Sequence, residues 1–329
     1  MQRLRALLDP FMLALIAMIA LASLLPVRGA AVAGFEILTV AGIAALFFLH
    51  GARLSRTAIV AGLTHWRLHV LVLSCTFVMF PLLGLGMRPL APLLLTPELY
   101  LGVLFLCALP STVQSSIAFT AIAKGNVPAA VCSASLSNLL GVLMTPLLVS
   151  LLLATHGDAT GSPQAVGRIA LQLLAPFVAG HLSRPWIGAW VERRRRVLAV
   201  TDRGTVLLVV YVAFSASVVG GLWQRVPLPA LAGALGVAIV LLALALVLTR
   251  WSSRRLGFDR ADESAIVFCG SNKSLASGVP IAKILFAGNP ALGMILLPVM
   301  LFHPIQLMAC ALLAQRYARR AAAENNQSI

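Results

Sequence analysis

The sequence predicts an all-α polytopic membrane protein whose ten transmembrane helices form two inverted five-helix repeats. Hydrophobic residues make up 60% and charged residues 11% of the 329-residue chain, and its mean hydropathy is +0.96, far above an ordinary soluble domain. Apolar runs recur along the whole chain at the length needed to cross a hydrocarbon core, roughly 20 helical residues. Polar clusters interrupt two of these runs at matching places, as in transporters built from inverted repeats.

The apolar runs are strong and continuous, which favours helices over the alternating strands of a barrel. They lie at residues 10–27, 30–50, 68–87, 98–123, 127–154, 165–186, 203–223, 228–250, 263–283 and 290–314. An odd number of spans per half makes the second half enter the membrane inverted relative to the first. We therefore expect a first repeat at 1–155, an inverted second repeat at 165–316 and a cytoplasmic tail at 317–329.

The first run has a second interpretation. Arg3 and Arg5 precede it, and the AVA at 31–33 resembles a cleavage site, so a cleaved secretory signal is the alternative to a retained first helix. A retained helix fits the distribution of charge better, because most of the 25 Lys and Arg residues then fall on one side of the membrane. The outer ends keep only Arg28, Arg88, Arg168, Arg225 and Lys283.

This asymmetry predicts cytoplasmic termini and a location in a bacterial inner membrane. The net charge of +15 then indicates contact with anionic lipids at the cytoplasmic face. Binding to nucleic acid is not expected, because no soluble module combines basic residues with exposed aromatic residues.

Cysteine and histidine give no sign of a metal or redox centre. All five cysteines fall inside predicted spans without a C-x-x-C spacing, so we interpret them as small packing residues. The six histidines are scattered along the chain, and no metal or cofactor is expected.

The polar clusters are ALPSTVQSSIAFTA at 108–121, in the fourth run, and CGSNKSLASGVP at 269–280, in the ninth. We expect both helices to be discontinuous there, with Pro110 and Gly270 offering places for the breaks. Such half-helices line a polar cavity at mid-membrane. The simpler alternative is that these hydroxyl groups only hydrogen bond between packed helices, as we expect for Ser135 and Ser217.

Lys273 is the unusual residue of the second cluster. It lies about ten residues beyond Asp262 and Glu263, hence roughly 15 Å deep, and a stem of about 6 Å cannot reach either interface. Placing lysine there costs at least about 2.5 kcal/mol, which predicts a wet or paired ammonium. The alternative to a functional cation is a structural ion pair with Glu36, the acidic residue well inside a predicted span.

Segments 108–148 and 268–307 resemble the bile acid:sodium symporter superfamily, and within it the divergent bile acid symporter-like branch. The resemblance covers nearly the whole chain and is carried by FC, a Lys-bearing polar turn, GVP, FAGNPAL and HP in the second segment. It implies a panel domain of spans 1, 2, 6 and 7 and a core domain of spans 3 to 5 and 8 to 10. Helices 4 and 9 would cross in the core.

The sodium-coupled pattern of that family is only partly present. Ser115-Ser116 stands where those members have Ser-Asn, Phe268 replaces a glutamate, and Lys273 adds a positive charge. Because sodium prefers oxygen ligands and is repelled by an ammonium, the departures argue against sodium coupling. If a sodium site exists, oxygen ligands from the fifth span would build it, and the candidates are Ser133, Ser137 and Asn138.

The sequence thus predicts a secondary transporter of a small organic solute, expected to be anionic, working by alternating access. Coupling to protons or passive transport are the expected modes. The residues expected to bind solute and ion are Gln114, Ser115, Ser116, Asn272, Lys273 and Ser274. The alternatives are an efflux carrier of the arsenite or metabolite type, and a membrane protein that regulates a partner without transport. An enzyme is not expected, because no catalytic constellation appears at membrane depth.

Overall fold

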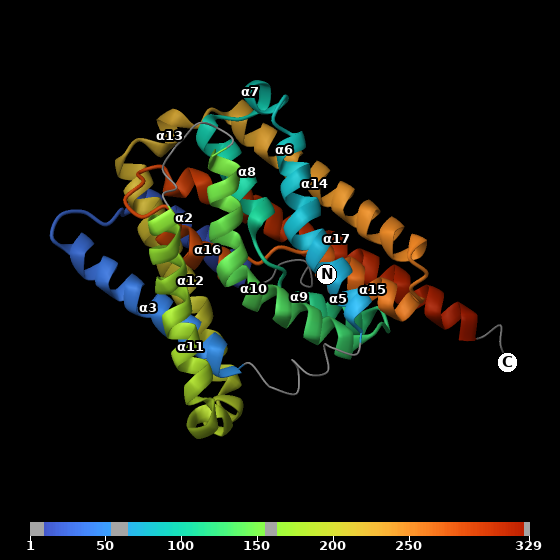
Figure 1. The fold of residues 1–329 in the computed structure, drawn as a ribbon. Coiled ribbons are helices and arrows are strands. Elements are labelled where there is room, and N and C mark those ends of the chain that lie inside the picture. The colour runs from blue at the N-terminus through green and yellow to red at the C-terminus, as the bar shows by residue number, and fades with distance from the viewer. Residues whose placement is uncertain (1–9, 54–64, 155–162, 326–329) are drawn as a thin grey trace.

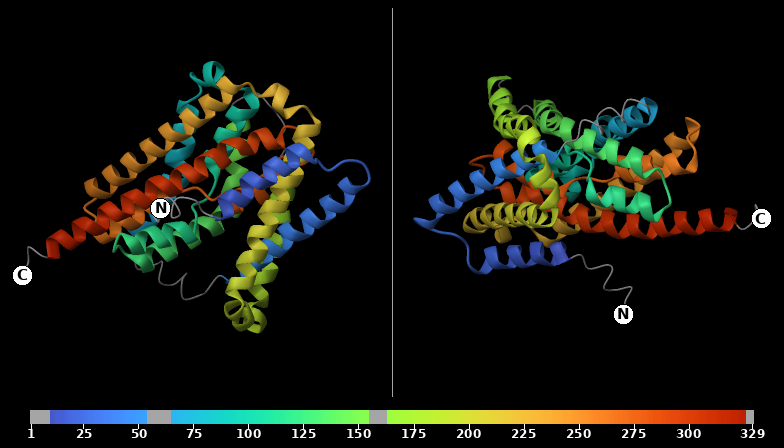
Figure 2. Two further views of the ribbon diagram at one scale, coloured as in Figure 1. Left: turned by 180° about the vertical axis from the view of Figure 1, so that it is seen from behind. Right: turned by 90° about the horizontal axis from the view of Figure 1, so that it is seen from below.

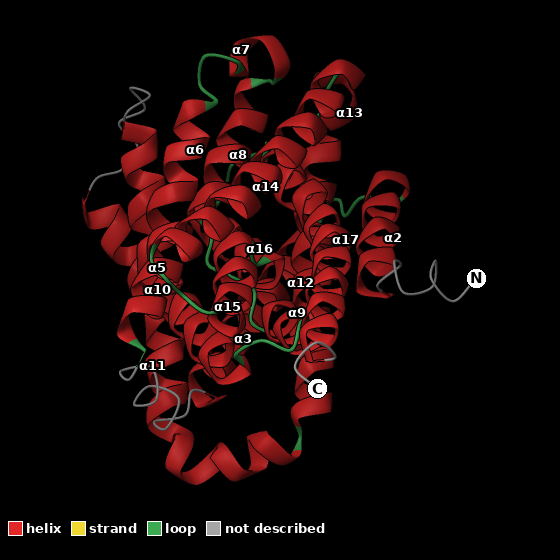
Figure 3. Ribbon diagram, turned by 90° about the vertical axis from the view of Figure 1, so that its right-hand side faces the viewer, coloured by secondary structure: helices red, strands yellow, loops and turns green. Residues whose placement is uncertain are grey.

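The computed structural model describes residues 10–53, 65–154 and 163–325. These residues form helices joined by loops, with no strand among them (Figure 3). Several residues of the charge and histidine arguments lie outside the described ranges, as does the end of the predicted tail at 326–329. They are Arg3, Arg5, Arg56 and His156.

The helices follow one another in an order that matches the apolar runs. They are α2 (Pro10–Leu24), α3 (Ala31–Arg53), α5 (Trp66–Ser74), the π-helical turn η1 (Cys75–Met79), α6 (Phe80–Gly86), α7 (Ala91–Leu94), α8 (Pro97–Ala108), α9 (Gln114–Ile122), α10 (Val127–Ala154), α11 (Pro163–Arg193), α12 (Arg195–Val219), α13 (Leu222–Arg225), α14 (Leu228–Arg255), α15 (Arg260–Ser271), α16 (Leu275–Leu285) and α17 (Leu292–Asn325).

Six stretches of the described helices are long and apolar enough to cross a membrane by length and composition. They are Ala31–Arg53, Trp66–Gly86, Val127–Leu152, Val197–Val219, Leu228–Arg255 and Leu292–Arg320. The other four predicted runs coincide with α2, with α8 and α9 together, with α11, and with α15 and α16 together. The described part of the chain is therefore an all-helical membrane protein, and the ten-span inverted repeat stays a prediction.

Four helices, α2, α3, α11 and α12, pack against one another at one side of the molecule (Figures 1 and 2). We call them the four-helix group, and α5 to α10 with α14 to α17 the larger group. The closest approach is between α3 and α11, where a Cβ on Gly51 would lie 1.9 Å from the Phe177 carbonyl oxygen. A Cβ on Gly180 would lie 1.8 Å from the Phe48 carbonyl oxygen, so only glycine fits at both positions.

Two helical segments of the larger group are interrupted. α8 ends at Ala108 and α9 begins at Gln114, while α15 ends at Ser271 and α16 begins at Leu275. The sequence predicted both breaks, because proline and clustered hydroxyl residues compete with regular helical hydrogen bonding. The backbone amide of Ser274 donates to the Pro110 carbonyl at 2.9 Å, so the two breaks lie against each other.

Candidate functional site: the paired helix breaks and the adjoining cavity

The broken backbone is satisfied by side chains of the opposite segment. Hydroxyl groups near the first break donate to carbonyls at the end of α15, which would otherwise lack partners in the membrane interior. The contacts are Ser111 Oγ to Cys269 O at 2.6 Å and Ser116 Oγ to Phe268 O at 2.9 Å. Asn272 Nδ2 in turn donates to Ser116 Oγ at 3.3 Å. The two breaks therefore form one hydrogen-bonded unit.

Lys273 lies at the centre of this unit and is 1% exposed. Its Nζ donates to the carbonyl oxygens of Thr76 at 2.8 Å, Cys107 at 2.9 Å and Leu109 at 2.7 Å. The same ammonium lies 4.1 Å from the centroid of the Phe80 ring, a favourable position for a cation. An ammonium has three donors, and here each one has an acceptor.

These acceptors explain why a lysine is tolerated at this depth. Cys107 is in the last turn of α8, and Leu109 is the residue that caps this helix. The carbonyls that end a helix have no intrahelical partner and carry the negative end of the helix dipole. Lys273 therefore caps α8 from across the break, and its charge is compensated by backbone dipoles.

Gln306 of α17 fixes the backbone of the same lysine. Its Oε1 accepts from the Lys273 amide and its Nε2 donates to the Lys273 carbonyl, both at 2.8 Å. Nε2 is also 3.0 Å from Nδ1 of His303. A buried glutamine that binds both the amide and the carbonyl of one residue replaces the helical hydrogen bonds lost at the break. No local pattern in the sequence indicates this contact, since the two residues are 33 positions apart.

The alternative pairing of Lys273 with Glu36 is wrong. Glu36 Oε1 instead binds Nζ of Lys283 at 2.6 Å. Lys283 lies in the last turn of α16, whereas Lys273 precedes that helix and points into the larger group. The acidic residue inside the second predicted span thus ties α3 to the far end of α16.

A cavity of about 430 Å³ lies between the four-helix group and the larger group. On the larger-group side it is bordered by the starts of α9 and α16 and by the middle of α10. On the other side the wall comes from α2, α3, α11 and α12, and its polar members are His50, Arg53, Asp202 and Arg203. Apolar residues of both walls, among them Leu46, Phe177 and Leu139, complete it.

The predicted solute residues divide between this cavity and the break behind it. Gln114, Ser115 and Ser274 line the cavity. Ser116, Asn272 and Lys273 are buried in the contact between the breaks and are not among the lining residues. The breaks were found from sequence correctly, but the choice of solute-binding residues within them stays a prediction.

The three candidate ion ligands of α10 are engaged with different partners. Ser133 Oγ lies 2.7 Å from Nδ1 of His69. Ser137 Oγ accepts from the Ser111 amide at 3.0 Å, and Asn138 Oδ1 accepts from Ser277 Oγ at 2.7 Å. Of the three, Asn138 lines the cavity.

The charged residues of the four-helix wall were missed as site residues. Arg53 ends α3 and Asp202 lies on α12, and their side chains form an ion pair through Nη1 and Oδ2. The guanidinium of Arg203 lies over the Phe11 ring, 5.7 Å from its centroid. In the count of positive charges, both arginines were among the Lys and Arg residues on the predicted cytoplasmic side. The one available signal was Asp202, an acidic residue at the edge of an apolar run.

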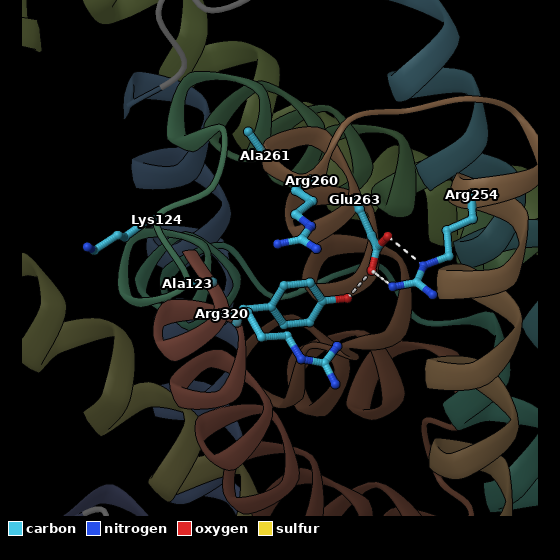
Figure 4. A pocket seen from close by; sticks show the side chains of 8 residues that line it. Ala123, Lys124, Arg254, Arg260, Ala261, Glu263 and Arg320 are labelled. Atoms are coloured by element: carbon cyan, nitrogen blue, oxygen red, sulfur yellow. Dashed lines mark hydrogen bonds and ion pairs between the residues drawn. The ribbon is translucent and has the colours of Figure 1, made fainter. Parts of the chain in front are cut away.

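A second, much smaller cavity of about 50 Å³ lies where α15 meets α17 and the end of α9 (Figure 4). Glu263 accepts there from Nε of Arg254 at 2.8 Å, and the Tyr317 hydroxyl donates to the same carboxylate. These contacts join α14, α15 and α17 within the larger group. The space is too small for an organic solute, so the larger cavity is the candidate binding site.

Comparison with known proteins gives the family. The model of the SBF-like CPA transporter family (DUF4137) matches residues 9–319. The chain is 63% identical over 320 residues to the uncharacterised protein PA2026 of Pseudomonas aeruginosa, covering 97% of this chain and 96% of that protein. It is 56% identical over 313 residues to the Escherichia coli protein named "Putative symporter YfeH", covering 95% and 94%.

A more distant relative is the rat protein named sodium/bile acid cotransporter 7, 28% identical over 271 residues, covering 81% of this chain and 78% of that protein. The resemblance in segments 108–148 and 268–307 is thereby confirmed. The family match over nearly the whole chain and the helical membrane architecture agree on one conclusion. This chain belongs to the SBF-like CPA transporter family and is a membrane transporter or symporter.

Proposed function

We propose that this chain is a secondary transporter that carries a small organic anion by alternating access, with the solute held in the 430 Å³ cavity. The observation that carries the proposal is the position of this cavity between the two helix groups, against the paired breaks. Its volume falls in the range of about 300–1,000 Å³ typical of sites for small molecules. Movement of one group past the other would expose it to each side in turn.

Electrostatics favour an anion. α9 and α16 both begin at the cavity, so the positive ends of two helix dipoles face it. No side chain caps the start of α9, which leaves its amides available. Arg53 and Arg203 add two positive charges against the single negative charge of Asp202.

We propose further that transport does not use sodium. The relatives named sodium/bile acid cotransporter 7 suggest otherwise by name. In this chain, however, Phe268 stands where the sodium-coupled members of the bile acid:sodium symporter superfamily have a glutamate. The carbonyls of Thr76, Cys107 and Leu109 already bind an ammonium. Proton coupling or passive carriage is the consistent mode.

The proposed orientation has both termini in the cytoplasm of a bacterial cell. Arg53, Asp202 and Arg203 then lie toward the cytoplasmic ends of α3 and α12, so the cavity opens inward. A C-terminal reporter should be active in the cytoplasm, and activity confined to the periplasm would contradict the orientation.

The test of function uses an obstructed cavity. Purified protein is screened by thermal shift against small organic acids, and the acid that stabilises it most is followed by counterflow in proteoliposomes. Ala276→Phe places a ring in the cavity and should abolish counterflow without loss of folded protein, because Ala276 lines the cavity and is exposed there. The matched control is Ala44→Phe, at an exposed position of α3 that does not line the cavity. Equal counterflow in the two variants would refute the proposal.

A further inference from the structure

The ion pair of Arg53 and Asp202 is incompletely satisfied. One guanidinium nitrogen, Nη1, meets one carboxylate oxygen, Oδ2. The remaining atoms, Nη2 of Arg53 and Oδ1 of Asp202, are buried and have no hydrogen-bond partner among the residues that the structure describes. Arginine and carboxylate groups commonly pair through two parallel hydrogen bonds, so this single contact leaves a buried donor of Arg53 and a buried acceptor of Asp202 unused.

Both side chains line the transport cavity and remain partly exposed, 26% for Arg53 and 13% for Asp202. Buried unsatisfied groups are uncommon in native proteins and call for an explanation. On the opposite wall, hydroxyl groups of the described residues already bond to polar side chains of the same wall, as in Ser115 Oγ to Thr112 Oγ1 and Ser277 Oγ to Asn138 Oδ1.

We propose that Arg53 and Asp202 form a head-group subsite that selects anions carrying a hydrogen-bond donor beside the carboxylate, as in a 2-hydroxy acid. This subsite rests on the proposed transport of organic anions and specifies their chemical class. The solute carboxylate accepts from Arg53, and its hydroxyl group donates to Asp202. Insertion between the two side chains exchanges one half-satisfied ion pair for two satisfied contacts.

The charge and shape of the cavity agree with this ligand. Arg53 and Asp202 cancel in charge, and Arg203 supplies the positive charge that balances a monoanion. Arg203 is held at the wall by its stacking on Phe11. Beyond the charged residues the cavity is bordered by Leu46 and Phe177, so the remainder of the solute is a short aliphatic or aromatic body.

The experiment compares three probes of nearly the same size: 2-hydroxy-4-methylpentanoate, 4-methylpentanoate and 4-methyl-1-pentanol. Binding to the full-length purified protein is measured by calorimetry at fixed, low ionic strength, because exposed charges are screened by salt. We expect the hydroxy acid to bind about tenfold more tightly than the plain acid, and the alcohol not to bind, since hydrogen bonds to charged groups have about this effect.

Variants separate the two roles. Asp202→Ala should bring the two acids to equal affinity, while Arg53→Gln should weaken both by about tenfold. If Asp202→Ala does not fold because Arg53 loses its partner, Arg53→Gln with Asp202→Asn removes both charges together and should show no preference. The matched control is Arg254→Gln, which removes a guanidinium from another ion pair outside this cavity and should bind like the wild type.

The outcomes distinguish this inference from the proposed function. Equal affinity of both acids for the wild type, or an unchanged preference in Asp202→Ala, overturns the subsite and leaves anion transport standing. If neither acid binds, the subsite is overturned and the proposed carriage of small organic acids is contradicted as well.

Discussion

The ammonium of Lys273 lies 2.9 Å from the carbonyl oxygen of Cys107, in the last turn of α8, and this contact joins the two helix breaks. The lysine acts as a cap for a helix that lies 166 residues earlier in the chain. Its charge is therefore held by backbone dipoles, and the described structure places no carboxylate on it.

Lys273→Met should destabilise the protein. Methionine has a similar volume but leaves three buried carbonyls without a donor, at about 1–3 kcal/mol each. Removal of the buried charge offsets about 2.5–3.5 kcal/mol of this cost. We expect a net loss on the order of 3 kcal/mol, measured as a lower melting temperature in detergent.

The companion measurement is the double variant Lys273→Met with Glu36→Gln. Since Glu36 binds Lys283, neutralising it should give no rescue. Recovery of the wild-type melting temperature in the double variant would show that Lys273 pairs with Glu36, contrary to the structure.

Gln306→Met should also destabilise the break, because it removes the acceptor of the Lys273 amide and the donor to its carbonyl. The expected cost is about 2–4 kcal/mol for two unsatisfied backbone groups. The loss of stability is measured as a lower melting temperature in thermal unfolding. The control is Gln114→Met, at an exposed position of α9. Equal melting temperatures for the two variants would rule out the bracing role of Gln306.

Replacement of sodium by choline on both sides of proteoliposomes should leave the uptake rate within about twofold. The reason is that Ser133 and Ser137 are engaged with His69 and the Ser111 amide, and Lys273 adds a repelling charge nearby. A tenfold loss of uptake would show a sodium site that these contacts conceal.

Gly51→Ala should separate α3 from α11. The new methyl group would lie 1.9 Å from the Phe177 carbonyl oxygen, so the helices must move apart at a cost of about 1–3 kcal/mol. Gly236→Ala in α14 is the matched control, because its Cβ meets nothing within 4 Å and alanine favours the helix. The melting temperature should fall for the first variant and hold or rise for the second; the opposite order would contradict the packing.

The features that could be predicted from the sequence are those marked by neighbouring residues, namely the helix breaks and the depth of Lys273. Pro110 lies in the first break as predicted, whereas Gly270 still lies inside α15 and the second break follows it at residues 272–274. The hydroxyl clusters marked both breaks, and the distance from Asp262 predicted that Lys273 lies deep in the membrane. The partners of Lys273 could not be found in this way, because backbone carbonyls look the same at every residue. Glu36 was the wrong partner because counting acidic residues ignores where helix ends meet.

The cavity shows the same limit. Gln114 and Ser274 lie next to the breaks and were identified by position, whereas Arg53 and Asp202 come together only when α3 packs on α12. Arg53 was counted only as a positive charge on the cytoplasmic side, and Asp202 was not considered. A count of positive charges indicates orientation but carries no information about which face of a helix lines a cavity.

The lysine cap also bears on the order in which the chain assembles. The three carbonyls that bind Lys273 belong to the first half of the chain, at Thr76, Cys107 and Leu109. Their donor is synthesised later, 164 residues after Leu109. In the first half alone these carbonyls would lack a hydrogen-bond donor inside the membrane, where an unsatisfied backbone group costs several kcal/mol. Inserted early segments must therefore stay loosely associated, or shielded by an insertion factor, until the segment carrying Lys273 arrives and closes the bundle.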